Sequence, residues 1–227
     1  MDRCDYTNGG VRPSRTPLRG VSDGGTRAPS GQHGGEQRPE LMKYACELKP
    51  DTNTICANLK LCNDDRMVAV AGEQQPCCEQ PERFENWPQL LCTDGVTGRC
   101  YWEVEFSGNV HVAVTYGGIG RRGDGDDCVF GENDQSWSLR CSEACGYSVW
   151  HNKTNTVIPS SSPSSSSSGS NRVAVFVDYP AGTLSFFRVC SDKLIHLHTF
   201  NTTFTEPLYP GFGFWLWPSS SVSLCAL

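Results

Sequence analysis

The sequence predicts an all-β fold, a sandwich of antiparallel strands preceded by a disordered tail. From Leu41 onward, short runs rich in β-branched and aromatic residues are separated by Gly, Pro, Asn or Asp about every ten residues, a spacing typical of sandwiches. No amphipathic helix of three turns is evident. With 37% hydrophobic residues and six Trp, the 227-residue chain has enough apolar surface to form one core.

Residues 1–40 are predicted to be a disordered linker or tail, because they are dominated by Gly, Pro, Ser and Arg and show no apolar periodicity. They contain six Arg and five acidic residues, so the rest of the chain is acidic, with 13 basic against 20 acidic residues. This charge, with only five Lys, argues against nucleic acid and anionic membrane surfaces as partners. No apolar run approaches the ~20 residues of a membrane span, and the start of the chain lacks the apolar core of a signal peptide. We therefore expect no membrane insertion and a cytoplasmic location.

The clearest strands cover residues 100–106 and 110–116, and the tight connection at 107–109 predicts that they form a hairpin. In the first strand, period-two alternation predicts one buried face and one half-exposed face. The buried face carries Trp102, Val104 and Phe106, and the other carries Tyr101, Glu103 and Glu105. The second strand is apolar on both faces.

A second hairpin is predicted from residues 173–178 and 183–189 around the Pro- and Gly-containing turn at 179–182. Another strand is expected at 194–200. The run at 209–217 is too apolar on both faces for an exposed edge strand and should lie inside a sheet. Residues 159–170 consist of nine Ser, two Pro and one Gly and predict a flexible surface loop.

The thirteen cysteines are odd in number and irregularly spaced, and no C-x-x-C pair occurs. This pattern argues against a zinc ribbon or a thioredoxin-like redox centre. We expect reduced thiols, several of them buried as small apolar side chains.

Several short motifs suggest cofactor or metal chemistry, and each has a simpler interpretation. Residues 118–123 match G-x-G-x-x-G, but the acidic residues 124–127 follow where a dinucleotide site needs a helix. The tripeptide Arg-Gly-Asp at 122–124 and its neighbouring Asp residues are better explained by a solvated acidic loop than by an integrin ligand or a calcium site. His196 and His198 share a strand face but have no third ligand of matching spacing. The sequence therefore predicts no cofactor and no metal.

An enzymatic function is not predicted. No G-x-S-x-G elbow and no recognised context for a catalytic Cys is present, so no catalytic residue is assigned. The glycosylation sequons at Asn152 and Asn201 would matter only in a secreted chain.

Five segments of the sequence carry a resemblance to a known family. They are Trp-Glu-Val-Glu at 102–105, the block Val-Asp-Tyr-Pro-Ala-Gly-Thr-Leu-Ser-Phe-Phe at 177–187, Tyr-Pro-Gly-Phe-Gly-Phe at 209–214, and the upstream segments 44–54 and 81–92. Together they resemble the B30.2/SPRY family, the PRY plus SPRY module of tripartite-motif ubiquitin ligases, butyrophilins, stonefish-type toxins and many fish NOD-like receptors.

The resemblance implies one domain of two curved antiparallel sheets in a concanavalin-like or jelly-roll-like sandwich, with a PRY segment at 41–96 and a SPRY segment at 97–227. One departure from the family pattern affects the start of the domain. Pro50 and Thr52 replace the Leu and Pro of the family's L-D-P-N-T motif, and proline cannot donate to a sheet ladder, so pairing near Pro50 should be irregular.

The resemblance also implies a non-enzymatic module in which loops capture a protein ligand. The segment at 33–36 resembles the segment that precedes the module in fish NOD-like receptors, which favours a cytosolic innate-immune receptor. The alternative is the substrate-recognition end of a tripartite-motif E3 ubiquitin ligase. Neither the ligand nor an oligomeric state is assigned.

The candidate binding surface is placed by position in these loops. Trp102 and Trp215 are expected in the core, whereas three other Trp lie beside turns, where an indole can anchor a partner. The predicted ligand-binding residues are Trp87, Tyr116, Arg121, Arg122, Asp124, Asn133, Trp137, Trp150 and Asn152.

Overall fold

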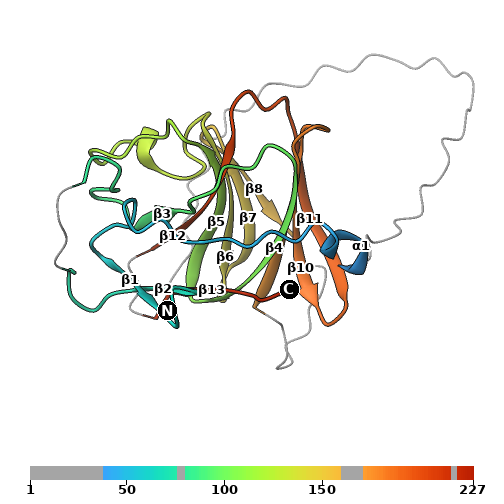
Figure 1. The fold of residues 1–227 in the computed structure, drawn as a ribbon, viewed down its shortest axis with the longest axis horizontal. Helices are drawn as coiled ribbons and strands as arrows, with labels where there is room; N and C mark the ends of the chain where they lie inside the picture. Colours follow the sequence, from blue (N-terminus) through green and yellow to red (C-terminus); the bar gives the residue numbers. More distant parts are fainter. Residues whose placement is uncertain (1–37, 76–79, 160–170, 216–218) are drawn as a thin grey trace, which may run out of the picture. The chain divides into compact units, whose positions relative to one another are not determined.

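The computed structural model describes residues 38–75, 80–159, 171–215 and 219–227, and these residues form a sandwich of two antiparallel sheets (Figure 1). The elements, in chain order, are α1 (Arg38–Met42), β1 (Leu59–Cys62), β2 (Met67–Val70), β3 (Gln89–Leu91), β4 (Arg99–Ser107), β5 (Asn109–Tyr116), the 3-10 helix η1 (Asp126–Cys128), β6 (Ser136–Ser142), β7 (Gly146–His151), β8 (Thr154–Ile158), β9 (Arg172–Asp178), β10 (Thr183–Cys190), β11 (Lys193–Asn201), β12 (Leu208–Phe214) and β13 (Ser221–Leu224). The predicted all-β sandwich is confirmed.

One sheet has seven strands in the order β1-β2-β13-β4-β9-β10-β11, and the other has six in the order β3-β12-β5-β6-β7-β8. Alternate residues of each strand point between the sheets, where side chains such as Trp102, Phe186 and Phe212 form one hydrophobic core. Over the part of the chain that the structure describes, no helix has the length and apolarity needed to cross a bilayer.

The β9–β10 hairpin is confirmed, with Leu184 opposite Val177. The prediction that the 209–217 run lies inside a sheet is also confirmed for β12, which pairs with β3 on one side and β5 on the other. Near the start of the domain, Pro50 forms only an isolated bridge with Cys92, which is the irregular pairing expected there.

The predicted β4–β5 hairpin is wrong, because the two strands belong to different sheets. β4 pairs with β13 and β9, whereas β5 pairs with β12 and β6. The short connection is a corner that carries the chain from one sheet to the other. Gly108 makes this corner with a φ of +71°, and a Cβ there would lie 2.6 Å from the hydroxyl oxygen of Ser220. Glycine is therefore needed for both conformation and space.

The predicted half-exposed face of β4 is instead buried at Tyr101 and Glu103. Helix α1 covers it, and Leu41 packs with Tyr101 and Phe187 in a second, smaller apolar cluster. The helix begins at Arg38, three residues inside the predicted tail. Residues 1–37 of that tail, and 160–170 of the Ser-rich segment, lie outside the described residues.

A buried carboxylate fixes α1 to β4. Arg38 donates to Glu103 from Nε at 2.5 Å and from Nη2 at 3.1 Å, and Arg172 on β9 donates from Nη1 at 3.2 Å. The hydroxyl of Tyr101 donates to the same carboxylate at 2.6 Å, and burial together with this bond raises the pKa of Tyr101. A charge that is buried in this way is stable only while its partners are present.

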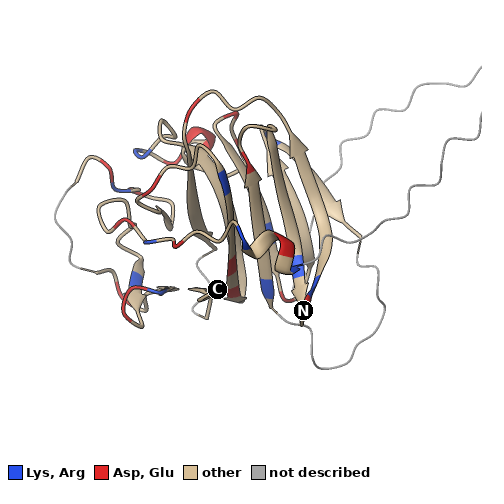
Figure 2. Cartoon of the chain, turned by 45° about the vertical axis from the view of Figure 1, so that its right-hand side comes forward, with Lys and Arg blue, Asp and Glu red and all other residues tan. Residues whose placement is uncertain are grey.

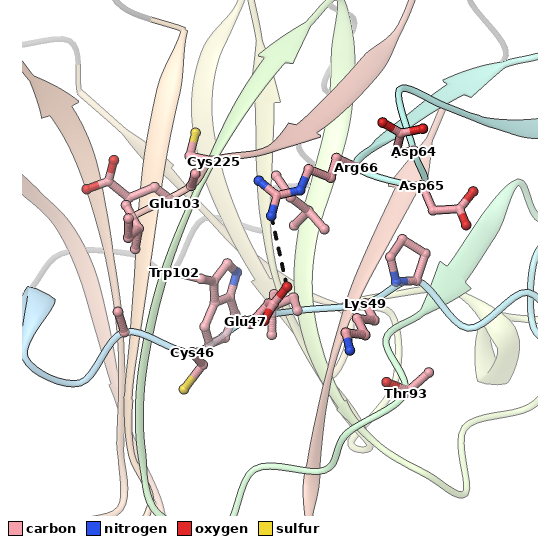
Figure 3. A pocket seen from close by; sticks show the side chains of 16 residues that line it. Cys46, Glu47, Lys49, Asp64, Asp65, Arg66, Thr93, Trp102, Glu103 and Cys225 are labelled. Carbon is pink, nitrogen blue, oxygen red and sulfur yellow. Dashed lines mark ion pairs between the residues drawn. The ribbon is translucent and has the colours of Figure 1, made fainter.

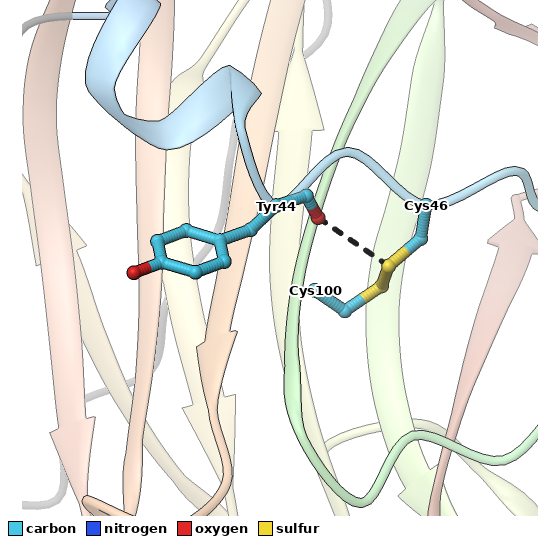
Figure 4. The surroundings of a disulfide bond; sticks show 3 residues. All are labelled: Tyr44, Cys46 and Cys100. Carbon is cyan, nitrogen blue, oxygen red and sulfur yellow. Dashed lines mark hydrogen bonds between the residues drawn. A yellow bond between two sulfur atoms is a disulfide. The ribbon is translucent and has the colours of Figure 1, made fainter.

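Among the described cysteines, Cys46 and Cys100 depart from the expected reduced state. Cys46 and Cys100 form a disulfide with their Cα atoms 5.5 Å apart, beside the carbonyl of Tyr44 (Figure 4). The parallel bridge between Ala45 and Tyr101 brings the two cysteines together although 54 residues separate them in sequence, a pairing that no spacing motif reveals. The expectation of several buried thiols is confirmed by Cys56, Cys92, Cys128 and Cys141.

Candidate functional site

The outer face of the six-stranded sheet is built from one continuous row of residues. The strand registers align, from β3 to β8, Gln89, Gly213, His111, Arg140, Ser148 and Val157. Trp150 and Ser138 stand in the next row on the same face, because side chains two residues apart point the same way. The row joins segments that are distant in the sequence.

Two glycines of β12 make a hollow in this face, and the loop between β5 and β6 fills it. A Cβ at Gly211 would lie 2.8 Å from Cζ of Phe130, and one at Gly213 would lie 3.3 Å from Cδ2 of the same ring. The Gln89 side chain holds the loop by accepting from the Phe130 amide at 2.9 Å and donating to the Cys128 carbonyl at 2.7 Å. The loop therefore covers the β3–β12 side of the face.

Beside this loop, an arginine lies among aromatic rings. Cζ of Arg140 lies 3.4 Å from the ring centroid of Trp150 and 5.4 Å from that of Trp215, and Nη2 donates to Glu132 at 2.6 Å. Trp215 is 42% exposed and lies 5.6 Å from His111, centroid to centroid. Trp87, His111 and Trp215 line a small cavity. We call Trp87, His111, Arg140, Trp150 and Trp215 the indole–arginine cluster.

Polar atoms in and beside the cluster are left unpaired. Within the described ranges, Nε1 of Trp87, Nδ1 of His111 and Oγ of Ser138 are buried and have no hydrogen-bond partner. Unpaired buried polar groups are rare because each costs free energy. These unpaired groups lie in and beside a cluster whose one exposed ring is that of Trp215.

Burial, together with the positive charge of Arg140, holds the pKa of His111 well below its ordinary value. The unfolded chain therefore takes up a proton at His111 below about pH 6.5 while the folded chain does not. We expect the free energy of unfolding to fall with decreasing pH below this point, by about 1.4 kcal/mol per pH unit from this residue. Urea denaturation of the wild type and His111→Gln between pH 7 and 5 measures the difference. Parallel pH dependences in the two proteins would contradict a neutral buried His111.

Two of the sequence-predicted site residues hold the loop in place. Arg121 donates to the carbonyls of Glu82, Ile119 and Gly117, and its Cζ lies 4.5 Å from the ring centroid of Phe84. The amide nitrogen of Asn133 donates to the carbonyls of three residues around η1, and its oxygen accepts from the Gln135 amide and the Ser136 hydroxyl. The side chains of both residues position the loop mainly by hydrogen bonds to backbone atoms.

Two predicted surface residues are buried. Tyr116 and Trp137 lie on the inward side of the six-stranded sheet with centroids 5.3 Å apart, and Trp137 stacks on His151 at 4.7 Å. The strand register that places the Arg140 side chain on the outer face of the sheet places that of Trp137 on the inner face. The rings of Tyr116 and Trp137 therefore cannot contact a partner of the folded domain. Conversely, the core position predicted for Trp215 is wrong because β12 ends at Phe214. Trp102 is in the core as predicted.

The remaining predicted residues are accessible. Arg122 and Asp124 lie in the β5–β6 loop, and Trp87 and Trp150 are half-buried in the cluster. Asn152 is exposed at the β7–β8 turn, where it and Lys153 have φ values of +48° and +62°. Lys153 pairs with Asp126 at 2.9 Å, so this turn borders the same surface. Basic and acidic positions are interspersed over the strands and loops (Figure 2).

Sequence reasoning missed His111, Arg140 and the exposure of Trp215. Alternation marks the two faces of one strand, but neither the register nor the partner strands can be derived from it. Among the described residues, no group of three or more His, Cys, Asp and Glu side chains is placed to hold a metal ion.

Two family models match this chain. Residues 99–225 match the SPRY domain, and residues 51–96 match the SPRY-associated domain. The chain is 40% identical over 177 residues to stonustoxin subunit beta of Synanceia horrida, covering 78% of this chain and 24% of that protein. It is 32% identical over 182 residues to tripartite motif-containing protein 16 of Mus musculus, covering 79% of this chain and 31% of that protein. The chain thus spans about a quarter of the length of the first of these relatives.

Solved structures give the same result. The stonustoxin structure superposes with a TM-score of 0.77 at 36% identity, covering 88% of this chain and 32% of the other. The TRIM65 PSpry domain superposes with a TM-score of 0.71 at 25% identity, covering 91% of this chain and 100% of the other.

Proposed function

The chain belongs to the SPRY family, whose domain is a protein-interaction module, and on that premise we propose that it binds a protein ligand through the indole–arginine cluster. The observation that supports this most is Arg140, which lies against Trp150 and near the exposed ring of Trp215 on a rigid sheet. Tryptophan and arginine dominate the binding energy of protein interfaces. Arg140 and Trp150 lie on strands β6 and β7, and anchors that are fixed in this way lose little conformational entropy on binding.

The proposed rim of this centre is polar and solvated, because Arg122 and Asp124 in the β5–β6 loop and Asn152 at the β7–β8 turn are exposed. The buried N–H of Trp87 would donate to an acceptor oxygen of the ligand. No step of this mechanism requires a covalent intermediate or a cofactor, and the binding energy comes from desolvated rings and hydrogen bonds.

The proposal is tested by partner capture with the full chain. We expect Trp215→Ala and Arg140→Ala each to lower the recovery of a common set of proteins at least tenfold, because hot-spot truncation costs about 2 kcal/mol or more. Lys60→Ala is the control, since Lys60 is exposed on β1 of the other sheet and lies outside the cluster. Quantitative mass spectrometry of proximity-labelled or precipitated proteins measures recovery. If Trp215→Ala and Arg140→Ala recovered the same proteins in the same amounts as the control variant, the assignment of the cluster as the binding site would be refuted.

For the parent protein, we propose a cytoplasmic receptor of NOD-like type acting in innate immunity. The resemblance of residues 33–36 to the segment that precedes the module in such receptors supports this. The alternative is the substrate-recognition end of a tripartite-motif ubiquitin ligase, which the similarity to tripartite motif-containing protein 16 supports. The coding sequence upstream separates them. Leucine-rich repeats ending before residue 33 identify the receptor, and a RING domain identifies the ligase.

One observation favours a second candidate, a recognition module of a secreted protein similar to the stonustoxin subunits. Disulfides persist in oxidising compartments and are rare in the cytosol, and Cys46 is joined to Cys100. Alkylation before and after reduction, followed by peptide mass spectrometry on protein from its natural cell, measures this pair. An oxidised pair supports secretion, and a reduced pair supports the cytoplasmic proposal.

A further inference from the structure

We propose that a second groove, remote from the indole–arginine cluster, binds an extended peptide that carries basic side chains. The groove lies between the segment Cys46–Pro50, the β1–β2 turn at Asp64–Arg66 and the C-terminal residues 224–227, with a volume of about 670 Å³ (Figure 3). This volume is within the range of about 300–1,000 Å³ that is usual for ligand pockets. The groove shares no lining residue with the indole–arginine cluster.

The floor of the groove contains an unpaired donor. Trp102 is 2% exposed, and its Nε1 is buried without a hydrogen-bond partner in the described part of the chain. Figure 3 shows the indole with its nitrogen turned towards Arg66. Trp150, by contrast, donates from Nε1 to the Ser148 hydroxyl at 2.8 Å. A buried indole usually finds an acceptor, so the Trp102 N–H points to a ligand with a carbonyl oxygen.

One wall of the groove has backbone amides without hydrogen-bond partners. Cys46–Lys49 runs without a partner strand between two isolated bridges, Ala45 with Tyr101 and Pro50 with Cys92. Over the described residues, the amides of Glu47, Leu48 and Lys49 make no hydrogen bond, whereas the Lys49 carbonyl accepts from the Thr93 amide at 2.9 Å. Amides of successive residues in an extended segment point to opposite edges, so an added strand would use alternate ones. A stretch of this kind can accept an added strand, in which main-chain bonds supply affinity. An extended peptide chain provides both the main-chain acceptors and the carbonyl that Trp102 lacks.

The charge of the groove favours a peptide with basic side chains. Glu47, Asp64 and Asp65 line it, and the one ion pair among these side chains is the weak contact of Glu47 with Arg66, at 3.9 Å and largely exposed. Glu103 also lines the groove, but its carboxylate is already bound by Arg38 and Arg172. The three open acidic groups outnumber the two basic ones, Lys49 and Arg66. The groove therefore favours a cationic peptide over an anionic one.

The test uses the indole proton of Trp102 as reporter. A ¹⁵N-labelled full chain is titrated with an N-acetylated, C-amidated octapeptide of alternating arginine and valine. Trp102→Phe assigns the resonance, and thermal unfolding verifies that this variant folds. We expect the Trp102 indole resonance to shift and to saturate. The matched octapeptide of alternating glutamate and valine should bind at least tenfold more weakly, because its side chains carry the same sign of charge as the groove.

A surface variant separates the groove from the rest of the domain. We expect Glu47→Gln combined with Asp64→Asn and Asp65→Asn to weaken arginine–valine peptide binding at least tenfold. The control, Glu73→Gln combined with Glu206→Gln, removes exposed charge elsewhere and should bind as the wild type does. An unmoved Trp102 resonance, equal binding of the acidic peptide, or wild-type binding by the triple variant would overturn the proposal. A shift that grows with protein concentration alone would identify a second copy as the occupant and would also overturn it.

Discussion

Glu103→Ala is expected to lower the free energy of unfolding by about 3–5 kcal/mol, as removal of one partner from a buried ion pair does. The substitution would leave the guanidinium groups of Arg38 and Arg172 without their shared carboxylate and the Tyr101 hydroxyl without its acceptor. The contact that fixes α1 to β4 would also be lost. Urea denaturation followed by tryptophan fluorescence measures the change through the midpoint and slope of the transition.

Glu105→Ala is the control for this prediction. Glu105 lies two residues further along β4 and accepts from Nη2 of Arg172 at 2.8 Å, but its side chain is largely exposed. Exposed ion pairs contribute about 0–1 kcal/mol, so we expect a change within that range. Equal losses in the two variants would show that the burial of Glu103 has no energetic consequence.

Trp137→Ala is expected to lower the free energy of unfolding by about 3–5 kcal/mol, the usual cost of truncating a large core aromatic. Its ring packs in the core between Tyr116, His151 and Phe204. The loop position of Trp137 in the sequence suggested a surface anchor, for which binding would fall while stability stayed constant. The buried position of Trp137 predicts instead that the substitution lowers stability directly, and that any loss of binding follows from this loss of stability.

Trp215→Ala provides the comparison, because it truncates an exposed tryptophan whereas Trp137→Ala truncates a buried one. Because Trp215 is exposed at the end of β12, its removal should change stability by less than about 1 kcal/mol, whereas Trp137→Ala should not. The same denaturation experiment measures both variants. A larger loss for Trp215→Ala than for Trp137→Ala would reverse the assignment of the two residues.

Local patterns predicted the strands themselves well, because apolar alternation and turn residues are encoded within a few positions. The β9–β10 pair follows directly from its Pro- and Gly-containing turn. The same logic failed at Gly108, since a tight glycine connection is compatible with a hairpin and with a corner between sheets. Whether the connection is a hairpin or a corner depends on which strands pair with the edges of β4 and β5.

The candidate site was only partly accessible to sequence reasoning. Trp87 and Trp150 were predicted from their loop and turn positions, and the structure places both in one cluster. Arg140 and His111 become neighbours only through the register of β5 and β6. A one-residue slip would exchange Arg140 with Leu139, and no local pattern fixes that register. The Cys46–Cys100 pair depends in the same way on contacts between distant segments.

Site-specific photo-crosslinking tests the central claim most directly. p-Benzoyl-phenylalanine is placed at position 215, in the indole–arginine cluster, or at position 157, on the exposed β8 edge of the same sheet, and the full chain is irradiated in cells. We predict that a partner protein is crosslinked from position 215 and that Arg140→Ala abolishes this crosslink. A partner crosslinked from position 157 but not from position 215 would contradict the account.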